Sequence, residues 1–428
     1  MSRMQAVENV VVASGLWNNG RRDGSHGFIL SPGRFEITQS QQEALTMLGR
    51  SLYECLAGMG RIFAIASNQR LSSGRTWDAI GKALRTGVPS TYRETQIHKP
   101  GETPEIFRAD VMIGVDGQFS IAEIEGQKKH GLGYSVLASR VSTEALGNSA
   151  SFAGVAASLA SVVAKKRLPD NRLTLLYADQ EEFYVPEFMI LKAELKKFDV
   201  ELAVCPELNV RVDNGTFIPR GEAEQPHTLI DFPFFYHHPQ LNAALERHYL
   251  EGTVNFLIPP KPFLGSKTML AILRNDEQNP ELENILRSQI KSESLDRARA
   301  AIPETYLVHT KMSPEIVQAI EQKGGFIVKE VLASGMKGIG FDEDDDFLER
   351  FAKARKANYL HILQREIETA RIKLPYFTDE GEERFDDWYL RIGVFYAKRG
   401  ISDISVTARR DKRVHGATDC LQIGTVVV

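Results

Sequence analysis

Residues 106–125 read IFRADVMIGVDGQFSIAEIE, and this stretch decides the fold. Apolar and polar residues alternate on both sides of Asp116-Gly117. This pattern predicts a β-hairpin, because successive side chains of a strand point to opposite faces and Asp-Gly is a preferred two-residue turn. Arg108 and Asp110 are two residues apart, as are Glu123 and Glu125, so each pair projects from one face of its strand. The sequence therefore predicts a sheet face on which three carboxylates and one arginine meet.

This charged face has two interpretations. A solvated surface would need no further explanation. However, the flanking residues, among them Phe107 and Ile124, are apolar, which places the charges on an otherwise half-buried sheet. Mg²⁺ takes oxygen ligands and is usually held by one or two carboxylates together with substrate phosphates. The group therefore also suits a hard-cation site.

Helical and strand patterns extend on both sides of this hairpin. Apolar residues at helical spacing predict helices at 41–63 and 77–84, and a helix rich in small residues is expected over 149–166. Residues 172–205 predict a strand, a helix and a second strand, which is a βαβ unit. We expect residues 228–238, TLIDFPFFYHH, to form an apolar strand.

The rest of the chain divides into a polar segment and a strand-rich end. Residues 275–294 are polar and charged, which predicts a mobile surface segment rather than core. The last third predicts strands in GGFIVKEV, NYLHILQREI, WYLRIGVFYA, SDISVTAR and LQIGTVVV, with a helix over 345–354. The acidic run 342–346 is most simply the start of this helix, and His237-His238 favours a structural or substrate-pocket role over metal binding.

Composition limits the class of protein and its partners. The chain has 428 residues, 43% of them hydrophobic and 25% charged, with a formal net charge of −4. These values are typical of a globular chain of two or three lobes and give no general attraction to nucleic acid or anionic membranes. The three cysteines are far apart, and no apolar run reaches the ~18 residues of a membrane span. We expect a soluble, cytoplasmic protein with neither nucleic acid nor membrane as a partner.

Two lysines and a glycine-rich loop indicate anion binding. Lys267 in LGSKTML is at a predicted helix start, and Lys329 in GGFIVKEV is inside a predicted strand. Either lysine alone is more often a surface residue, but one that faces inward needs an anion. The loop ASGMKGIGF, residues 333–341, can offer backbone N–H groups to phosphate. Neither a P-loop nor a dinucleotide-binding fingerprint is present, so those two nucleotide folds are excluded.

The third charged group is the run TARRDKRVHGATDCLQIG at 407–424. Its arginines and Lys412 could form a solvated turn. Its place just before the last strand also makes it a candidate for binding a substrate anion.

Taken in chain order, these motifs resemble the circularly permuted ATP-grasp ligases. The order is RxDxM, ExE after a turn, a strand ending in FFYHH, LGSK, a strand lysine, a glycine loop and a basic RxK segment before a terminal glycine. Eukaryotic-type glutathione synthetase and the synthetase domain of glutathionylspermidine synthetase are similar. The resemblance spans residues 105–428. It implies an α/β (α+β) chain with a circularly permuted ATP-grasp fold and an inserted α/β substrate lobe.

The resemblance also implies roles for individual residues. Arg108 matches the catalytic arginine that steadies the transferring phosphoryl and acyl groups. The implied magnesium ligands are Asp110, Glu123 and Glu125. The implied ATP-binding residues are Lys267, Lys329, Ser334, Gly335, Lys337, Gly338, Gln364, Glu366, Ile367 and Lys412. Ser135 and Arg410 match substrate-binding positions.

Two positions depart from the family pattern. Ala333 stands where glutathione synthetases have a further metal-binding Glu, and Arg391 stands where they have a ribose-contacting acid. Three parts are expected: 1–165, a helical layer with the metal-binding hairpin of the ATP-grasp core; 166–255, the inserted βαβ substrate lobe; and 256–428, the nucleotide-binding lobe with its glycine-rich lid.

The predicted function is an ATP-dependent carboxylate–amine ligase. It would form an amide through an acyl phosphate and release ADP and phosphate, with ATP and Mg²⁺ as cofactors and a small-molecule acid and amine as substrates. A homodimer is expected by analogy. Two alternatives stay open. One is a non-catalytic ATP-grasp-like nucleotide-binding module, which Ala333 and Arg391 favour. The other is a carboxylate-rich metal hydrolase, in which the hairpin carboxylates bind metal without ATP.

Overall fold

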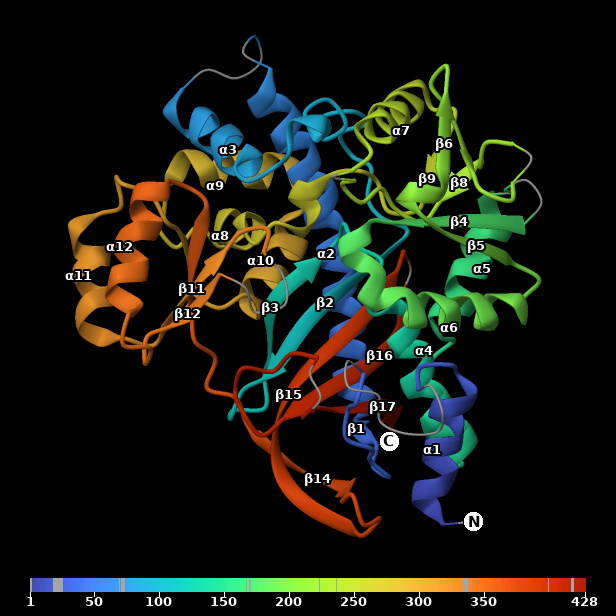
Figure 1. Cartoon of the computed structure of the whole chain (residues 1–428). Helices are drawn as coiled ribbons and strands as arrows, with labels where there is room; N and C mark the ends of the chain where they lie inside the picture. Colours follow the sequence, from blue (N-terminus) through green and yellow to red (C-terminus); the bar gives the residue numbers. More distant parts are fainter. Residues whose placement is uncertain are drawn as a thin grey trace.

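A central sheet with a lobe on either side organises the molecule (Figure 1). The computed structural model describes residues 2–17, 26–68, 70, 74–166, 168, 171–222, 224–235, 237–333, 338–398, 400–416 and 419–428. In this part of the chain no helix is long and apolar enough to cross a membrane.

Among these residues the central sheet has seven strands in the order β1-β17-β16-β15-β2-β3, with β14 also paired to β15. The strands are β1 (Phe35–Ile37), β2 (Ile106–Ile113), β3 (Phe119–Glu125), β14 (Arg371–Phe377), β15 (Glu383–Ala397), β16 (Gly400–Arg409) and β17 (Leu421–Val427). β15 pairs first with β14 and then, along the same edge, with β2. The sheet thus places the C-terminal strands directly beside the predicted hairpin.

The predicted hairpin is confirmed as β2 and β3. Arg108 lies opposite Glu125 and Asp110 opposite Glu123, and Gly117 takes the left-handed φ of 76° that the tight turn needs. The pairing shifts after Asp110, so that Ala122 is an extra residue in β3. This bulge lets Ile121 and Ile124 both pack into the core on one face, while Glu123 and Glu125 stay on the other.

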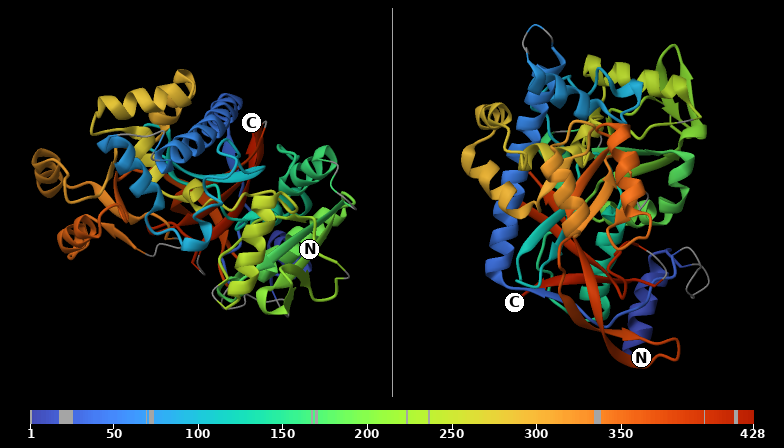
Figure 2. Two further views of the ribbon diagram at one scale, coloured as in Figure 1. Left: turned by 90° about the horizontal axis from the view of Figure 1, so that it is seen from above. Right: turned by 90° about the vertical axis from the view of Figure 1, so that its left-hand side faces the viewer.

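The long helix α2 (Gln39–Ser67) covers the apolar face of the central sheet (Figure 2). It begins with a capping box between Thr38 and Gln41, and its buried stripe includes Leu45 and Leu52. Three shorter helices pack against α2: α3 (Arg75–Arg85), α9 (Pro280–Gln289) and α10 (Ser292–Ala301). A fourth, α8 (Thr268–Arg274), packs against α3 and α10. α4 (Leu132–Arg140) packs on the opposite face, against β16 and β17. α1 (Arg3–Ala13) and α5 (Val155–Lys166) contribute to the same cluster as α4.

One lobe is a four-stranded sheet in the order β10-β13-β11-β12. Its strands are β10 (Thr305–Leu307), β11 (Phe326–Glu330), β12 (Ile339–Phe341) and β13 (His361–Arg365). Phe347 and Phe351 of α12 (Phe347–Ala357) and Ile320 of α11 (Pro314–Lys323) form a core with this sheet. Lys329 is therefore inside a strand, as predicted.

The other lobe contains a parallel sheet in the order β5-β4-β8-β9. It is built from β4 (Arg172–Tyr177), β5 (Glu201–Pro206), β8 (Thr228–Leu229) and β9 (Asn255–Phe256), with α6 (Val185–Lys196), α7 (Pro239–Glu251) and the hairpin of β6 (Val210–Asp213) and β7 (Thr216–Pro219). β4, α6 and β5 are the predicted βαβ unit.

Three expectations were wrong or incomplete. Among the described residues of 228–238, which leave out 236, only Thr228–Leu229 form a strand, because Pro233 has no N–H and the chain turns to bury Phe232 and Phe235. Residues 275–294 contain α9 and the start of α10 rather than a segment without core contacts, since Leu282, Ile285 and Leu286 recur at helical spacing and pack against the core. The helix expected over 149–166 begins at Val155.

The structure agrees with the prediction for His238 and also contains a helix that the sequence did not predict. The structural role of His238 is confirmed: its Nδ1 accepts a hydrogen bond from the Leu241 N–H at the start of α7. The helix α4, which begins next to Arg108 on the charged face of the sheet, was not predicted.

Candidate functional site

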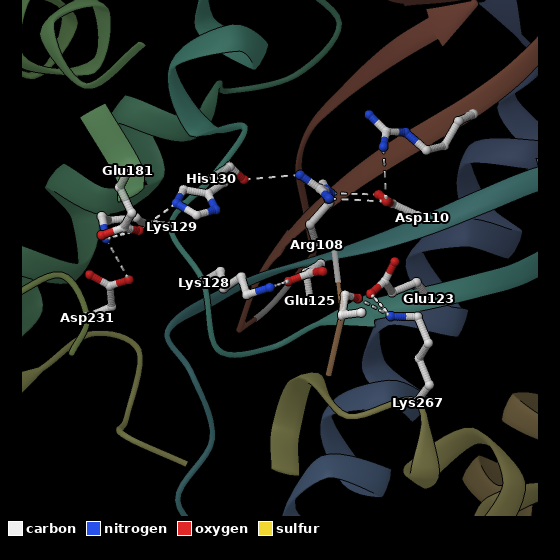
Figure 3. A network of polar contacts seen from close by, with 12 residues as sticks. Arg108, Asp110, Glu123, Glu125, Lys128, Lys129, His130, Glu181, Asp231 and Lys267 are labelled. Atoms are coloured by element: carbon white, nitrogen blue, oxygen red, sulfur yellow. Dashed lines mark hydrogen bonds and ion pairs between the residues drawn. The ribbon is translucent and has the colours of Figure 1, made fainter. Parts of the chain in front are cut away.

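Arg108 is held at the centre of the charged face. Its Nε and Nη2 donate to the two carboxylate oxygens of Asp110 at 2.6 and 3.1 Å, and its Nη1 donates to the His130 carbonyl at 3.1 Å (Figure 3). Burial lowers the pKa of Arg108, but the carboxylates of Asp110 and Glu125 outweigh it and raise the pKa above its ordinary value. Gly131 leaves room for this guanidinium, because a Cβ there would lie 2.6 Å from Nη1. Arg108 is thus a fixed cation.

Glu123 and Glu125 lie beside each other on β3 but differ in their partners. The Lys267 Nζ donates to Glu123 at 2.6 Å (Figure 3), and although burial raises the pKa of Glu123, Lys267 lowers it to about 2. Burial raises the pKa of Glu125 to about 7. The Oε2 atom of Glu125 is buried without a hydrogen-bond partner, and its nearest cation is the Lys128 Nζ at 4.0 Å.

Arg391 joins this group from β15. Its Nη1 lies 3.8 Å from the Asp110 Oδ2, and its Nη2 donates to the Thr407 hydroxyl at 3.2 Å. The position that departs from the family pattern therefore contacts a predicted magnesium ligand. Sequence spacing gave no signal for this contact, because the pairing of β15 with β2 is long-range.

A first cavity, the lysine cavity, lies between the central sheet and the β10–β13 sheet. Lys267, Lys329 and Lys412 line it together with Gln364, Glu366 and Ile367. Apolar walls are provided by Met112, Ile327, Ile339, Phe341 and Val414. The structure thus brings together the lysines and the 364–367 segment that the sequence assigned to ATP.

The lysines of this cavity are already paired. The Lys329 Nζ donates to the Gln364 Oε1 at 2.6 Å and to the carbonyl of the bulged Ala122 at 3.3 Å. Burial, and secondarily Lys267, lowers the pKa of Lys329 to about 8. The Lys412 Nζ lies 2.6 Å from a Glu366 carboxylate oxygen and 2.7 Å from one of Glu343.

A second cavity, the aromatic cavity, lies on the other side of the hairpin carboxylates. Arg108, Glu125 and Lys128 line one part of it, and rings line the rest: Phe28, Tyr134, Phe183, Tyr184 and Phe395. The two cavities share Asp110, Glu123, Arg391 and His415. The predicted metal-binding face is therefore the boundary between a lysine-lined and a ring-lined space.

Some predicted site residues lie elsewhere. Ser135 donates to the Asp403 carboxylate at 2.8 Å and is buried outside the lining of both cavities. Arg410 stacks on Trp388 at 4.4 Å and pairs with Asp386, also outside both linings. Ser334, Gly335 and Lys337 lie outside the described residues. Gly338 is described, with a φ of 69°, and its carbonyl accepts from the Glu330 N–H.

A buried ionic cluster next to the site was not predicted. The Lys129 Nζ donates to both oxygens of Glu181, at 2.9 and 3.1 Å, and to Asp231 at 3.2 Å (Figure 3). The His130 Nε2 lies 2.6 Å from Glu181, and its carbonyl is the one that binds Arg108. The only signal in the sequence is Lys128-Lys129-His130, which directly follows the hairpin.

The hairpin residues suit Mg²⁺ only in part. Carboxylate oxygens are the ligands that Mg²⁺ prefers, and the unpaired Oε2 of Glu125 is available as a ligand. Among the described residues, however, no three His, Cys, Asp or Glu side chains are grouped closely enough to hold a metal by themselves. This fits a cation bound jointly by the protein and by substrate phosphates, and does not fit a site made only of protein ligands.

Comparison with solved structures identifies the fold. A glutathione synthetase-like effector from Globodera pallida, solved in its apo form, aligns with a TM-score of 0.63 over 100% of this chain and 96% of its own length, at 13% identity. The fold is that of the ATP-grasp synthetases. This confirms the predicted fold class. The circular permutation and the three-part division stay predictions.

Two other solved structures are less similar. A putative γ-glutamylcysteine synthetase from Methylobacillus flagellatus aligns at 11% identity and a TM-score of 0.42 over 86% of each chain. D-alanyl-alanine synthetase A from Vibrio cholerae aligns at 15% identity and a TM-score of 0.29, over 52% of this chain and 66% of its own. No family model matches the chain, and no curated protein matches its sequence. The identification of the ATP-grasp fold therefore depends on the first structure alone.

Proposed function

We propose that this protein is an ATP-dependent ligase that joins a carboxylic acid to an amine. One observation carries the proposal: two cavities, one lined by lysines and the other by Arg108 and Lys128, meet at Asp110, Glu123 and Arg391. A phosphoryl donor in the first cavity and an acid in the second would have their reacting ends at this boundary.

The lysine cavity would bind ATP. Lys267 and Lys329 would neutralise phosphate oxygens, which would replace the Glu123 carboxylate at Lys267 and the Gln364 amide oxygen at Lys329. Ile327 and Phe341 offer apolar walls to the adenine, and the backbone at 364–367 offers hydrogen bonds to its edge. Because Lys329 is buried, an anion beside it relieves the cost of burying its charge.

Arg108 would act on the acid. A carboxylate oxygen attacks the γ-phosphorus of ATP, which breaks the bond to ADP and forms an acyl phosphate. The amine then attacks the acyl carbon, loses a proton and displaces inorganic phosphate. Arg108, oriented by Asp110 and the His130 carbonyl, would stabilise the negative charge on these oxygens. Glu123 and Glu125 would hold Mg²⁺, which supplies charge neutralisation at the phosphates when bound.

The proposal is tested by measuring ADP release from Mg-ATP with pooled acids and amines. Release that requires both an acid and an amine is expected. Release that needs neither would instead indicate a simple ATPase, and no release with any pair would contradict the ligase. Arg108→Ala and Glu123→Ala should retain the native fold, with a lower unfolding midpoint because each leaves an ion-pair partner behind, and should form no ADP.

A second candidate is a nucleotide-binding module without catalysis. The contact between Arg391 and Asp110 favours it, because it pairs one predicted magnesium ligand with two arginines. Tight Mg-ATP binding with no ADP release across the whole panel would support this candidate. Cytoplasmic localisation and a homodimer stay predictions.

A further inference from the structure

The charged residues of the aromatic cavity, here called its floor, and most of its rings, here called its ring-lined end, come from different segments. The floor comes from the central sheet: Arg108 from β2, Glu125 from β3 and Arg391 from β15. These residues are next to the boundary that the two cavities share. The rings come from other segments, with Phe28 before β1, Tyr134 on α4 and Phe183-Tyr184 between β4 and α6. An acid with its carboxylate on the floor would extend its other end among these rings.

The rings at this end are arranged as stacked pairs. His130 and Tyr184 are stacked at 4.1 Å with 15° between their planes, and His26 and Phe183 are stacked at 4.4 Å. Phe183 also meets Tyr184 edge to face at 5.2 Å. Phe183 keeps 46% of its surface exposed and lines the cavity, so its ring is accessible to a ligand there.

The acids behind the rings of this end do not line the cavity. The acids near it are occupied elsewhere: Glu181 is paired with Lys129, and Glu187 is buried and accepts from the Gly131 and Tyr134 N–H groups. Neither lines the cavity. Burial lowers the pKa of His130 to about 4, so its ring is neutral at pH 7. The carboxylates that do line the cavity, Asp110, Glu123 and Glu125, belong to its floor, so a neutral ring finds the π-faces of the other end.

We infer that the acid substrate carries an aromatic ring, which packs between Tyr134, Phe183 and Tyr184 while its carboxylate lies against Arg108 and Lys128. This inference rests on the proposed function for the assignment of the cavity to the acid. It gives the ligase a substrate class distinct from purely polar peptides, because the flat faces of these three rings favour packing of another ring.

The test compares acids of one size range in the ADP-release assay with an amine pool. The aromatic acids are phenylacetate and 3-phenylpropanoate, and the polar acids are glutamate and γ-glutamylcysteine. The aromatic acids should have a kcat/KM at least about tenfold higher, as expected for one buried ring. Phe183→Ala should raise KM for 3-phenylpropanoate about tenfold and leave KM for ATP unchanged.

Matched variants separate ring contact from general damage. Phe385→Ala removes an exposed phenylalanine of β15 that lines neither cavity, and should change neither KM. Phe183→Leu keeps an apolar side chain and should fall between wild type and Phe183→Ala. Binding of 3-phenylpropanoate by calorimetry, with Mg-ADP present, gives a readout that needs no turnover.

The outcomes distinguish the two claims. A preference for the polar acids, or an unchanged KM in Phe183→Ala, would overturn the aromatic substrate while leaving the ligase intact. Calorimetric binding of 3-phenylpropanoate that Phe183→Ala weakens, without ADP release from any acid, would support the aromatic ligand and overturn the ligase. Absence of both binding and ADP release would overturn both.

Discussion

Two lysine–carboxylate groups lie on opposite sides of the β2–β3 hairpin and have different surroundings. Lys267 pairs with Glu123 in the wall of the lysine cavity, where the lysine side chain is 3% exposed and the Glu123 side chain 21%, against 9% for Glu181 in the other group. Lys129 pairs with Glu181 and Asp231, and its own side chain is fully buried. Both lysines donate over 2.6 to 3.2 Å, so distance alone does not separate them.

The two groups differ in whether the lysine can exchange its carboxylate partner for a ligand. Glu123 can give up Lys267 to a phosphate that enters the cavity, so this pair can exchange partners during function. Lys129 keeps its partners, because it joins the segment after β3 to Glu181 and Asp231 of the lobe that contains the β5-β4-β8-β9 sheet. We therefore expect the first pair to matter for binding and the second for stability.

Lys129→Met should produce the largest effect, on stability. Removing one partner of a buried ion pair leaves charges unpaired and typically costs about 3–5 kcal/mol. Urea unfolding should show a loss of this size. A loss below about 1 kcal/mol would mean that Glu181 and Asp231 become neutral or solvated at little cost.

Lys267→Met should lower activity rather than stability. ADP release should fall roughly 100- to 1,000-fold, as for removal of one preorganised donor to developing charge, while the urea midpoint changes little. Loss of turnover together with a large loss of stability would contradict the expectation that the Lys267–Glu123 pair matters for binding and not for stability. Lys291→Met, at an exposed lysine on the surface, is the matched control.

Asp403→Asn extends the comparison to a buried carboxylate that has no lysine partner among the described residues. Asp403 accepts hydrogen bonds from the Ser135 hydroxyl and the Ile404 N–H. Burial raises the pKa of Asp403 from 3.8 to about 7. At pH 8 the ionised group destabilises the fold, and this cost is relieved as the pH falls from about 7 to 4, where only the folded state holds the proton.

The neutral Asn should therefore stabilise the protein at pH 8, on the order of 2 kcal/mol, since each pKa unit is about 1.4 kcal/mol and relaxation absorbs part of the shift. Its advantage should vanish near pH 4. Unfolding free energies at both pH values measure this, and an equal effect at both would contradict the assigned pKa.

Arg410→Ala should have the smallest effect. Arg410 stacks on Trp388 and pairs with Asp386 away from both cavities, so stability should change by less than about 1 kcal/mol and kcat/KM by less than about twofold. A large loss of activity would instead support the substrate role that the family resemblance implied.

The sequence predicted those parts of the site that depend on local pattern. Alternation and an Asp-Gly turn were enough for the hairpin, and strand periodicity placed Lys329 inside β11. The bulge at Ala122 and the contact of Arg391 with Asp110 arise from pairing between strands far apart in the chain, which no local pattern encodes. The Lys129 cluster joins three separate segments, and a lysine after a strand is ordinarily a surface residue.

Transfer of ¹⁸O tests the central claim most directly. The acid is labelled in both carboxylate oxygens and turned over with Mg-ATP and an amine, and the released inorganic phosphate is analysed by mass spectrometry. Attack of the carboxylate on the γ-phosphorus, followed by loss of phosphate to the amine, should leave one ¹⁸O atom in each phosphate. Unlabelled phosphate released together with the amide would contradict an acyl phosphate formed where the lysine and aromatic cavities meet.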